Sequence, residues 1–182
     1  MNRSEHYEKT FMELYNQYVD DVFRFCYVRL RDREKALDAT QDTFYKIWNE
    51  FIKNPGKVDQ LQNMRAFLFK IARNTLIDKT RKKTSTPFSF LVPTFDEERS
   101  TLEPIAFADN TLNPEQQQNF SHLSEHLELL DEHHREIIIL RFIHDMSVID
   151  IAETYNISEN TASVRIHRAL EHARKKLAHL YE

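Results

Sequence analysis

The stretch MSVIDIAETYNISENTASVRIHRAL, residues 146–170, decides the fold of the C-terminal part of this chain. It contains a short helical segment, 148–155, and a longer one that begins after Ser158. Asn156 stands between them, where a tight turn needs a left-handed backbone, and asparagine adopts that conformation more readily than most residues. Ser158 is a good N-cap for the second helix, which we expect to run to about Leu180. Two helices joined by so short a turn are typical of a helix-turn-helix.

The second helix of this pair has two faces of different chemistry. At about 100° per residue, one side collects small and apolar residues, namely Ala162, Ile166, Ala169, Leu170, Ala173 and Leu177. The opposite side carries hydroxyl and amide groups, which suit base edges in a major groove, and guanidinium groups, which suit phosphate or guanine. We therefore expect a DNA-binding surface here. Its members are Ser158, Asn160, Thr161, Ser163, Val164, Arg165, His167 and Arg168.

The composition favours an all-α protein. One glycine and five prolines in 182 residues leave little material for the turns of a β fold, and 41% hydrophobic residues suffice for ordinary cores. The net charge of −4 excludes a uniformly basic coat, so any contact with nucleic acid must come from local basic patches. The single cysteine, Cys26, excludes an intramolecular disulfide and is expected to be buried. No apolar run is long enough for a membrane span and residues 1–9 are too polar for a signal peptide, so we expect a cytoplasmic protein.

The N-terminal half is predicted to form three helices. The first covers 11–30, and Asp32 is expected to cap the second, which Asn54-Pro55-Gly56 ends. Apolar residues form one stripe of the second helix: Leu37, Phe44, Trp48 and Phe51. The third is expected over 64–83, with Phe67, Leu68, Ile71, Ala72 and Leu76 on its buried face. It carries seven basic residues against one acidic residue, a local net charge of +6 in an acidic protein.

The segment 84–114 has the composition of a linker. It holds four of the five prolines, is acidic and lacks helical periodicity. Helical periodicity returns with Phe120, Leu123, Leu127 and Leu130. We therefore expect an N-terminal helical bundle over 8–83, the linker over 84–114 and the helix-turn-helix domain over 115–182.

Three motifs, in this order, resemble the small two-domain extracytoplasmic-function (ECF) sigma factors of bacterial RNA polymerase. DATQDTFYKIW, residues 38–48, is similar to their polymerase-binding helix. FLFKIARNTLIDKTRKK, residues 67–83, is similar to the helix that melts and reads the minus-ten promoter element. Residues 140–177 resemble the domain that reads the minus-thirty-five element. Asp145 and Asn156 stand where glycines are often found in the family.

The resemblance implies a role for particular residues. The side chains that would face the clamp of the largest polymerase subunit are Asp38, Gln41, Asp42 and Tyr45. Those that would lie near minus-ten DNA are Arg73, Asn74, Lys79, Arg81, Lys82 and Lys83. In the family, the loop at 57–63 captures a base flipped out of the opened strand. The implied partners are core RNA polymerase, promoter DNA and an anti-sigma factor, with no cofactor and no small-molecule substrate.

Three other functions remain as alternatives. A conventional helix-turn-helix repressor or activator predicts tight, polymerase-independent binding to a palindromic site and a dimer interface. A helical adaptor predicts no effect of substitutions at Arg165 or Arg168. No set of residues in the sequence supports an enzyme, and we expect no enzymatic activity. The histidines, among them His122, His126 and the pair His133-His134, show no complete set of ligands, so we expect no metal.

For the free protein we hypothesise that the two DNA-binding units are occluded. Either they pack against one another or an anti-sigma partner covers them, and binding to polymerase separates them.

Overall fold

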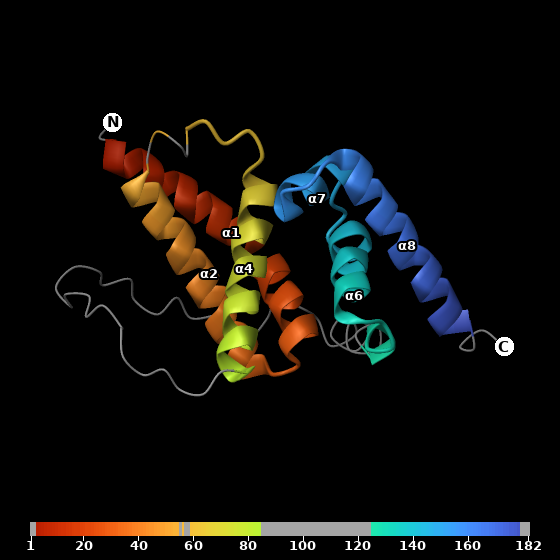
Figure 1. Ribbon diagram of the computed structural model, residues 1–182. Helices are drawn as coiled ribbons and strands as arrows, with labels where there is room; N and C mark the ends of the chain where they lie inside the picture. The colour runs from red at the N-terminus through yellow and green to blue at the C-terminus, as the bar shows by residue number, and fades with distance from the viewer. Residues whose placement is uncertain (1–2, 55, 57–58, 85–124, 179–182) are drawn as a thin grey trace.

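A computed structural model describes residues 3–54, 56, 59–84 and 125–178, and within these ranges every regular element is helical (Figure 1). The elements are α1 (Arg3–Leu30), α2 (Arg33–Lys53), α4 (Met64–Thr84), α6 (Glu132–Ile138), the π-helix η1 (Ile139–Ile143), α7 (Val148–Tyr155) and α8 (Glu159–Leu177). The expected all-α fold is confirmed. The proposed linker, 84–114, lies beyond the described residues apart from Thr84, which ends α4.

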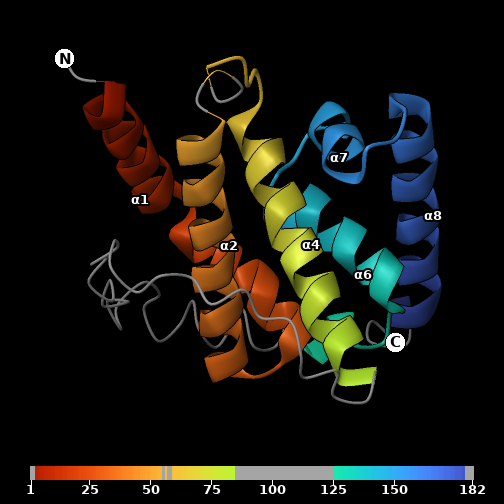
Figure 2. The same cartoon turned by 60° about the vertical axis from the view of Figure 1, so that its left-hand side comes forward.

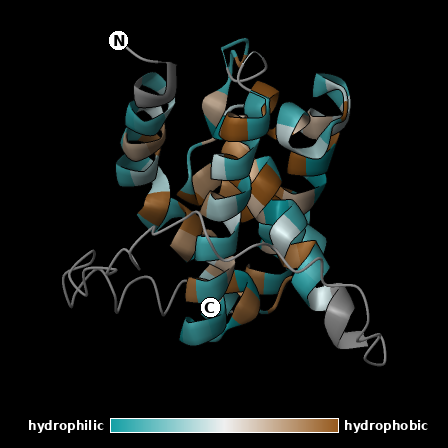
Figure 3. Ribbon diagram, turned by 90° about the vertical axis from the view of Figure 1, so that its left-hand side faces the viewer, coloured by the Kyte–Doolittle hydropathy of each residue, from teal (hydrophilic) through white to brown (hydrophobic). Residues whose placement is uncertain are grey.

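The N-terminal unit is a helical hairpin, α1 and α2, with α4 packed along it. The Asp32 carboxylate caps α2 by accepting a hydrogen bond from the backbone N–H of Lys35 at 3.1 Å, as predicted. The Phe11 ring forms T-shaped contacts with Phe44 and Phe51 at centroid distances of 6.3 and 6.2 Å. In Figure 3 the apolar residues gather where the helices face one another.

The start of the first helix differs from the sequence prediction. The first helix begins at Arg3 and not at Phe11, because Tyr7 continues its buried stripe and donates a hydrogen bond from its hydroxyl to Asp59 at 3.0 Å. The last helix is described to Leu177, and its predicted end near Leu180 lies outside the described residues. In α4 the expected apolar face is buried except for Phe67 and Ile71, which are half-buried because they line a pocket.

The C-terminal unit contains the predicted helix-turn-helix, α7 and α8. Asn156 ends α7 with φ 54° and ψ 51°, the left-handed conformation that its position required. Ser158 then caps α8 by accepting a hydrogen bond from the N–H of Thr161 at 3.2 Å. The small residues Ala162 and Ala169 of α8 are fully buried, which allows α8 to approach α6 and α7 closely.

The two units pack against each other through α4. Figures 1 and 2 show α4 between the N-terminal hairpin and the C-terminal helices, with α7 against its first turns. The His144 side chain, from the loop between η1 and α7, is 2% exposed and lies beside Phe25 of α1 and Phe69 of α4, at centroid distances of 6.2 and 4.9 Å. Buried apolar residues of both units form one continuous core.

Cys26 is fully buried in this core, as predicted, and burial raises the pKa of its thiol to about 12. The thiol therefore remains protonated and behaves as a small apolar side chain. None of the described helices combines the length and the apolar character that crossing a membrane requires.

Candidate nucleic-acid interface

The polar face of α8 is open to solvent. All eight residues expected there are exposed, from Ser158 at the N-cap to Arg168. The hydroxyl of Ser158 lies 2.8 Å from that of Thr161, so it belongs to the helix cap as well as to the surface. The guanidinium of Arg165 lies 5.9 Å from the centre of the Tyr155 ring, which orients it towards α7. This arrangement can present amide, hydroxyl and guanidinium groups to a major groove.

The basic residues of α4 are less free than those of α8. Arg73 is half-buried at the boundary between the two units, and its guanidinium stacks on Tyr155 at 4.4 Å. Asn74 is exposed, and Lys79 contacts Asp42 of α2 at 2.6 Å. The backbone of Arg81, Lys82 and Lys83 continues α4, but their side chains are outside the described part of the chain.

The four residues that the resemblance assigned to polymerase are all exposed on α2: Asp38, Gln41, Asp42 and Tyr45. Their neighbours Thr40, Thr43 and Phe44 are buried against the bundle. Thr40 and Thr43 donate their hydroxyls to backbone carbonyls one turn earlier, at 2.8 and 2.7 Å, so they need no other partner. The helix therefore offers two carboxylates, an amide and a half-exposed tyrosine as one outward surface.

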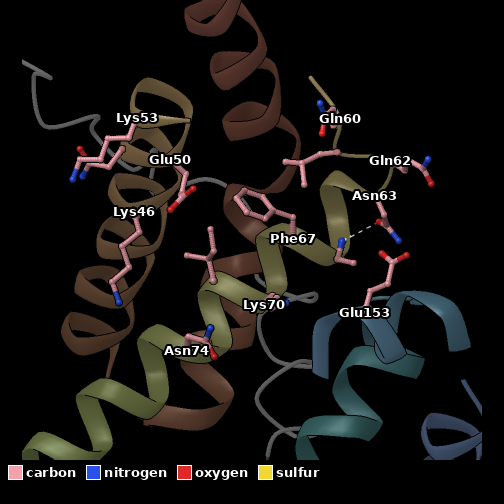
Figure 4. Close-up of a pocket in the computed structure, with 14 residues that line it drawn as sticks. Lys46, Glu50, Lys53, Gln60, Gln62, Asn63, Phe67, Lys70, Asn74 and Glu153 are labelled. Atoms are coloured by element: carbon pink, nitrogen blue, oxygen red, sulfur yellow. Dashed lines mark hydrogen bonds between the residues drawn. The ribbon is translucent and has the colours of Figure 1, made fainter. Parts of the chain in front are cut away.

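A pocket of about 830 Å³ lies between α2, α4 and the loop that joins them (Figure 4). Phe67 projects from α4 towards α2 within it. The basic side chains Lys46, Lys53 and Lys70 line it, with Glu153 reaching in from α7. An aromatic ring among cations suits a nucleotide, since bases stack on rings and phosphates need positive charge.

A buried ion cluster joins the two units. The carboxylate of Glu136 on α6 is only 4% exposed and accepts a hydrogen bond from Nη1 of Arg29 at 2.8 Å. Nε of Arg73 lies 2.7 Å from its other oxygen, a charge contact without hydrogen-bond direction. Burial, and then the charge of Glu136, raise the pKa of Tyr155, so its phenol stays protonated beside this cluster.

A second polar contact joins the start of α4 to α7. Asn63 accepts a hydrogen bond from the N–H of Ala66 at 3.0 Å, which caps α4, and donates one to Asp150 at 2.6 Å. Asp150 also completes the capping box of α7 with Ser147. Partial burial alone would raise the pKa of Asp150, but the hydrogen bonds from Asn63 and Ser147 outweigh it and hold that pKa below its ordinary value.

A third contact involves His144. Its backbone carbonyl accepts a hydrogen bond from Arg65, and its ring lies 3.5 Å from Asp21. Burial alone would raise the pKa of Asp21, but its interaction with His144 and the nearby arginines lower it overall.

Sequence reasoning missed the residues that join the two units. Glu136 and His144 are polar side chains that are buried, Arg29 is largely buried beside Glu136, and no local pattern marks such a residue as a buried partner. Glu153 at the pocket was also missed, because it comes from the C-terminal unit and no local pattern places it beside α4. The basic residues Lys46 and Lys70 were open to prediction, because each lies on a helix that borders the loop 57–63.

These features define a two-domain helical DNA-binding protein, and the comparisons with known proteins identify its class. The family model for sigma-70 region 2 matches residues 14–86, and that for sigma-70 region 4 matches residues 126–175. The chain is 30% identical over 178 residues to the ECF RNA polymerase sigma factor SigW of Bacillus subtilis, covering 95% of this chain and 91% of SigW. It is 27% identical to SigX of the same organism, over 96% of this chain and 87% of SigX.

Two solved structures share the fold. CnrH, in complex with the cytosolic domain of CnrY, matches with a TM-score of 0.62 and 20% identity over 94% of this chain and 89% of that one. RpoE of Bartonella quintana, in complex with the anti-sigma factor NepR, matches with a TM-score of 0.61 and 22% identity over 93% and 98%.

The chain belongs to the ECF family of bacterial RNA polymerase sigma factors. It therefore binds core RNA polymerase, directs it to specific promoters and helps to open promoter DNA. A stand-alone repressor or activator is not favoured, because both sigma regions are present in one chain.

Proposed function

We propose that three surfaces of this sigma factor divide the work of initiation. The exposed face of α8 reads the minus-thirty-five element, the basic face of α4 with the adjacent pocket engages the minus-ten element, and the outward face of α2 binds the polymerase clamp. The observation that carries the proposal is the exposure of every α8 and α2 residue expected at these surfaces. The corresponding domain division is 8–83, 84–114 and 115–182.

For the minus-ten element we propose that the pocket receives a base flipped out of the opened strand. Phe67 and Ile71 offer half-buried apolar surface to a base, while Lys46 and Lys70 can neutralise the adjoining phosphates. Flipping costs a few kcal/mol of stacking, which contacts of this kind can offset.

We further propose that the compact arrangement is the resting state. Glu136 holds Arg73, a residue expected at minus-ten DNA, and Glu153 of the C-terminal unit lines the pocket. Core polymerase would separate the two units so that these groups meet DNA. Pairing of the acidic linker with Arg73–Lys83 is a separate proposal, since Glu136 supplies the described partner of Arg73.

We also propose an anti-sigma partner that stabilises the compact state, action in the bacterial cytoplasm with the polymerase, and no catalytic step by this chain. Nucleotidyl transfer would be performed by the polymerase alone.

The deciding experiment is transcription in vitro with purified bacterial core polymerase on a promoter library. Transcripts should appear only when this protein is added. Asp42→Ala should reduce them by weakening polymerase binding, and Arg168→Ala should reduce them by weakening promoter binding. Glu34→Ala, an exposed acid in the first turn of α2, is the matched control and should retain full transcription.

The assay also separates the alternatives. Tight DNA binding without polymerase and no stimulation of transcription would indicate a repressor. Equal activity of wild type, Asp42→Ala and Arg168→Ala would contradict the assignment of the two surfaces.

A further inference from the structure

Asp131, His134 and His172 bring three metal-ligating atoms together in the C-terminal unit (the Asp131 cluster). Nδ1 of His134 lies 2.5 Å from Oδ2 of Asp131, and Nε2 of His172 lies 3.6 Å from the same oxygen. The two imidazole rings stack at a centroid distance of 4.6 Å with 24° between their planes. One ligand atom from each residue lies within 4.8 Å of the other two. The three ligand atoms therefore lie close together at the junction of α6 and α8.

Two packed helices hold this cluster in place. Oδ1 of Asp131 caps α6 by accepting a hydrogen bond from the N–H of His134 at 3.1 Å, which leaves Oδ2 to face the rings. His172 comes from α8, which packs directly on α6. Ligands presented by packed helices lose less freedom on binding an ion than ligands on a loop.

We propose that the Asp131 cluster binds a divalent transition-metal ion of the zinc type through Asp131 Oδ2, His134 Nδ1 and His172 Nε2. Two imidazoles and one carboxylate suit Zn²⁺, Ni²⁺ or Cu²⁺, whereas Mg²⁺ and Ca²⁺ prefer oxygen ligands. Zinc bonds to nitrogen and oxygen are about 2.0–2.2 Å, which requires its ligand atoms to lie roughly 3.3 Å apart. The three side chains, His134, His172 and Asp131, are 29%, 31% and 50% exposed, so they have room to rotate towards that spacing.

Asp131 supplies the negative charge among the three proposed ligands. Arg168 and Lys176 lie one turn before and after His172 on α8 and oppose a cation, so the charge of Asp131 is essential. With three ligands and water in the fourth position, binding is weaker than at a four-ligand structural site.

The bound ion would clip the start of α6 to the second half of α8. Glu132, the residue after Asp131, contacts Arg29 of the N-terminal unit, so the clip lies next to the contact between the units. An ion that binds only the folded chain stabilises it in proportion to its concentration over the dissociation constant.

The test is a titration of the untagged full chain with ZnCl₂ by calorimetry near neutral pH, followed by visible absorption with CoCl₂. Wild type should bind one ion per chain saturably, develop the d–d bands of coordinated Co²⁺, and show no such binding with MgCl₂. His134→Ala and His172→Ala should each weaken binding by about tenfold or more. Asp131→Asn keeps a good N-cap and removes the charge, and it should weaken binding with little change in helicity.

His133→Ala and His167→Ala are matched controls, because each removes a neighbouring histidine from the same two helices. They should bind as wild type does. No saturable Zn²⁺ binding to wild type would overturn the proposal. So would an equal loss in the control variants, which would indicate diffuse binding to surface histidines. Circular dichroism of each variant separates loss of the site from loss of the fold.

Discussion

At the scale of single residues, Glu136 joins the two units through a buried ion cluster. It is a buried carboxylate between Arg29 and Arg73, both from the N-terminal unit. Buried charges are tolerated only when they are paired, and removing one partner of a buried pair costs about 3–5 kcal/mol. The same contact holds Arg73 away from solvent, so one residue links the packing of the units to the availability of a DNA-binding group.

Glu136→Gln should therefore open the molecule. The variant leaves half-buried Arg73 without its counter-charge and leaves Arg29 with only the exposed carboxylate of Glu132, so separation of the units restores their hydration. We expect a larger radius of gyration by small-angle X-ray scattering and a free energy of unfolding lower by about 3 kcal/mol. Glu132→Gln is the control: it also contacts Arg29, but its side chain is 56% exposed, so a change of at most about 1 kcal/mol is expected. An unchanged radius and stability for Glu136→Gln would contradict this role.

At the scale of elements, the turn between α7 and α8 depends on a left-handed residue. Asn156 has φ 54°, and its backbone N–H closes the end of α7. Asn63 similarly serves two elements, because it caps α4 and bonds to Asp150 of α7. Local residues thus end one helix and position the next.

Asn156→Ala should destabilise the helix-turn-helix by about 1–2 kcal/mol, because alanine pays the full steric cost of the left-handed region. Asn156→Gly is the matched variant and should be close to wild type, since glycine has no such cost. Thermal unfolding followed by circular dichroism measures both. If the two variants melted at the same temperature, the turn would not depend on the conformation of this residue.

At the scale of the whole molecule, the contact between the units depends on ionised carboxylates. Asp21 faces His144, and Asp150 faces Asn63, and both carboxyls have pKa values below the ordinary 3.8. Because the pKa of each carboxyl is lower in the folded than in the unfolded state, the ionised carboxylate stabilises the fold. This stabilisation is complete above the ordinary, unfolded-state pKa and is lost as the pH falls through the folded-state pKa.

The compact form should therefore persist at neutral pH and loosen only in acid, below about pH 4. Sedimentation velocity across this range, with Asp21→Asn and Asp150→Asn as variants, is the measurement. Each variant should sediment more slowly than wild type at neutral pH and respond less to acid. A compact form that loosened between pH 5 and 7 would point to histidine instead of these carboxylates.

The sequence predicted the features that depend on interactions between residues close together along the chain. The boundaries of α7, the caps Asp32 and Ser158, the left-handed Asn156 and the two faces of α8 depend on residues within about one helical turn, which a periodic pattern records. The exposed face of α8 and its chemistry followed for the same reason. The α2 surface came from the resemblance, and the binding roles of both surfaces remain predictions to be measured.

Only the tertiary structure decided how the units meet. The burial of Glu136 between Arg29 and Arg73, the entry of Glu153 into the pocket, and the approach of His172 to Asp131 and His134 all join side chains on different helices. Sequence reasoning considered the histidines only by their neighbours along the chain, so it expected no metal. Helices pack to bury their apolar faces. The polar side chains at the edges of those faces are thereby brought against polar side chains of the neighbouring helix, which are distant in the sequence.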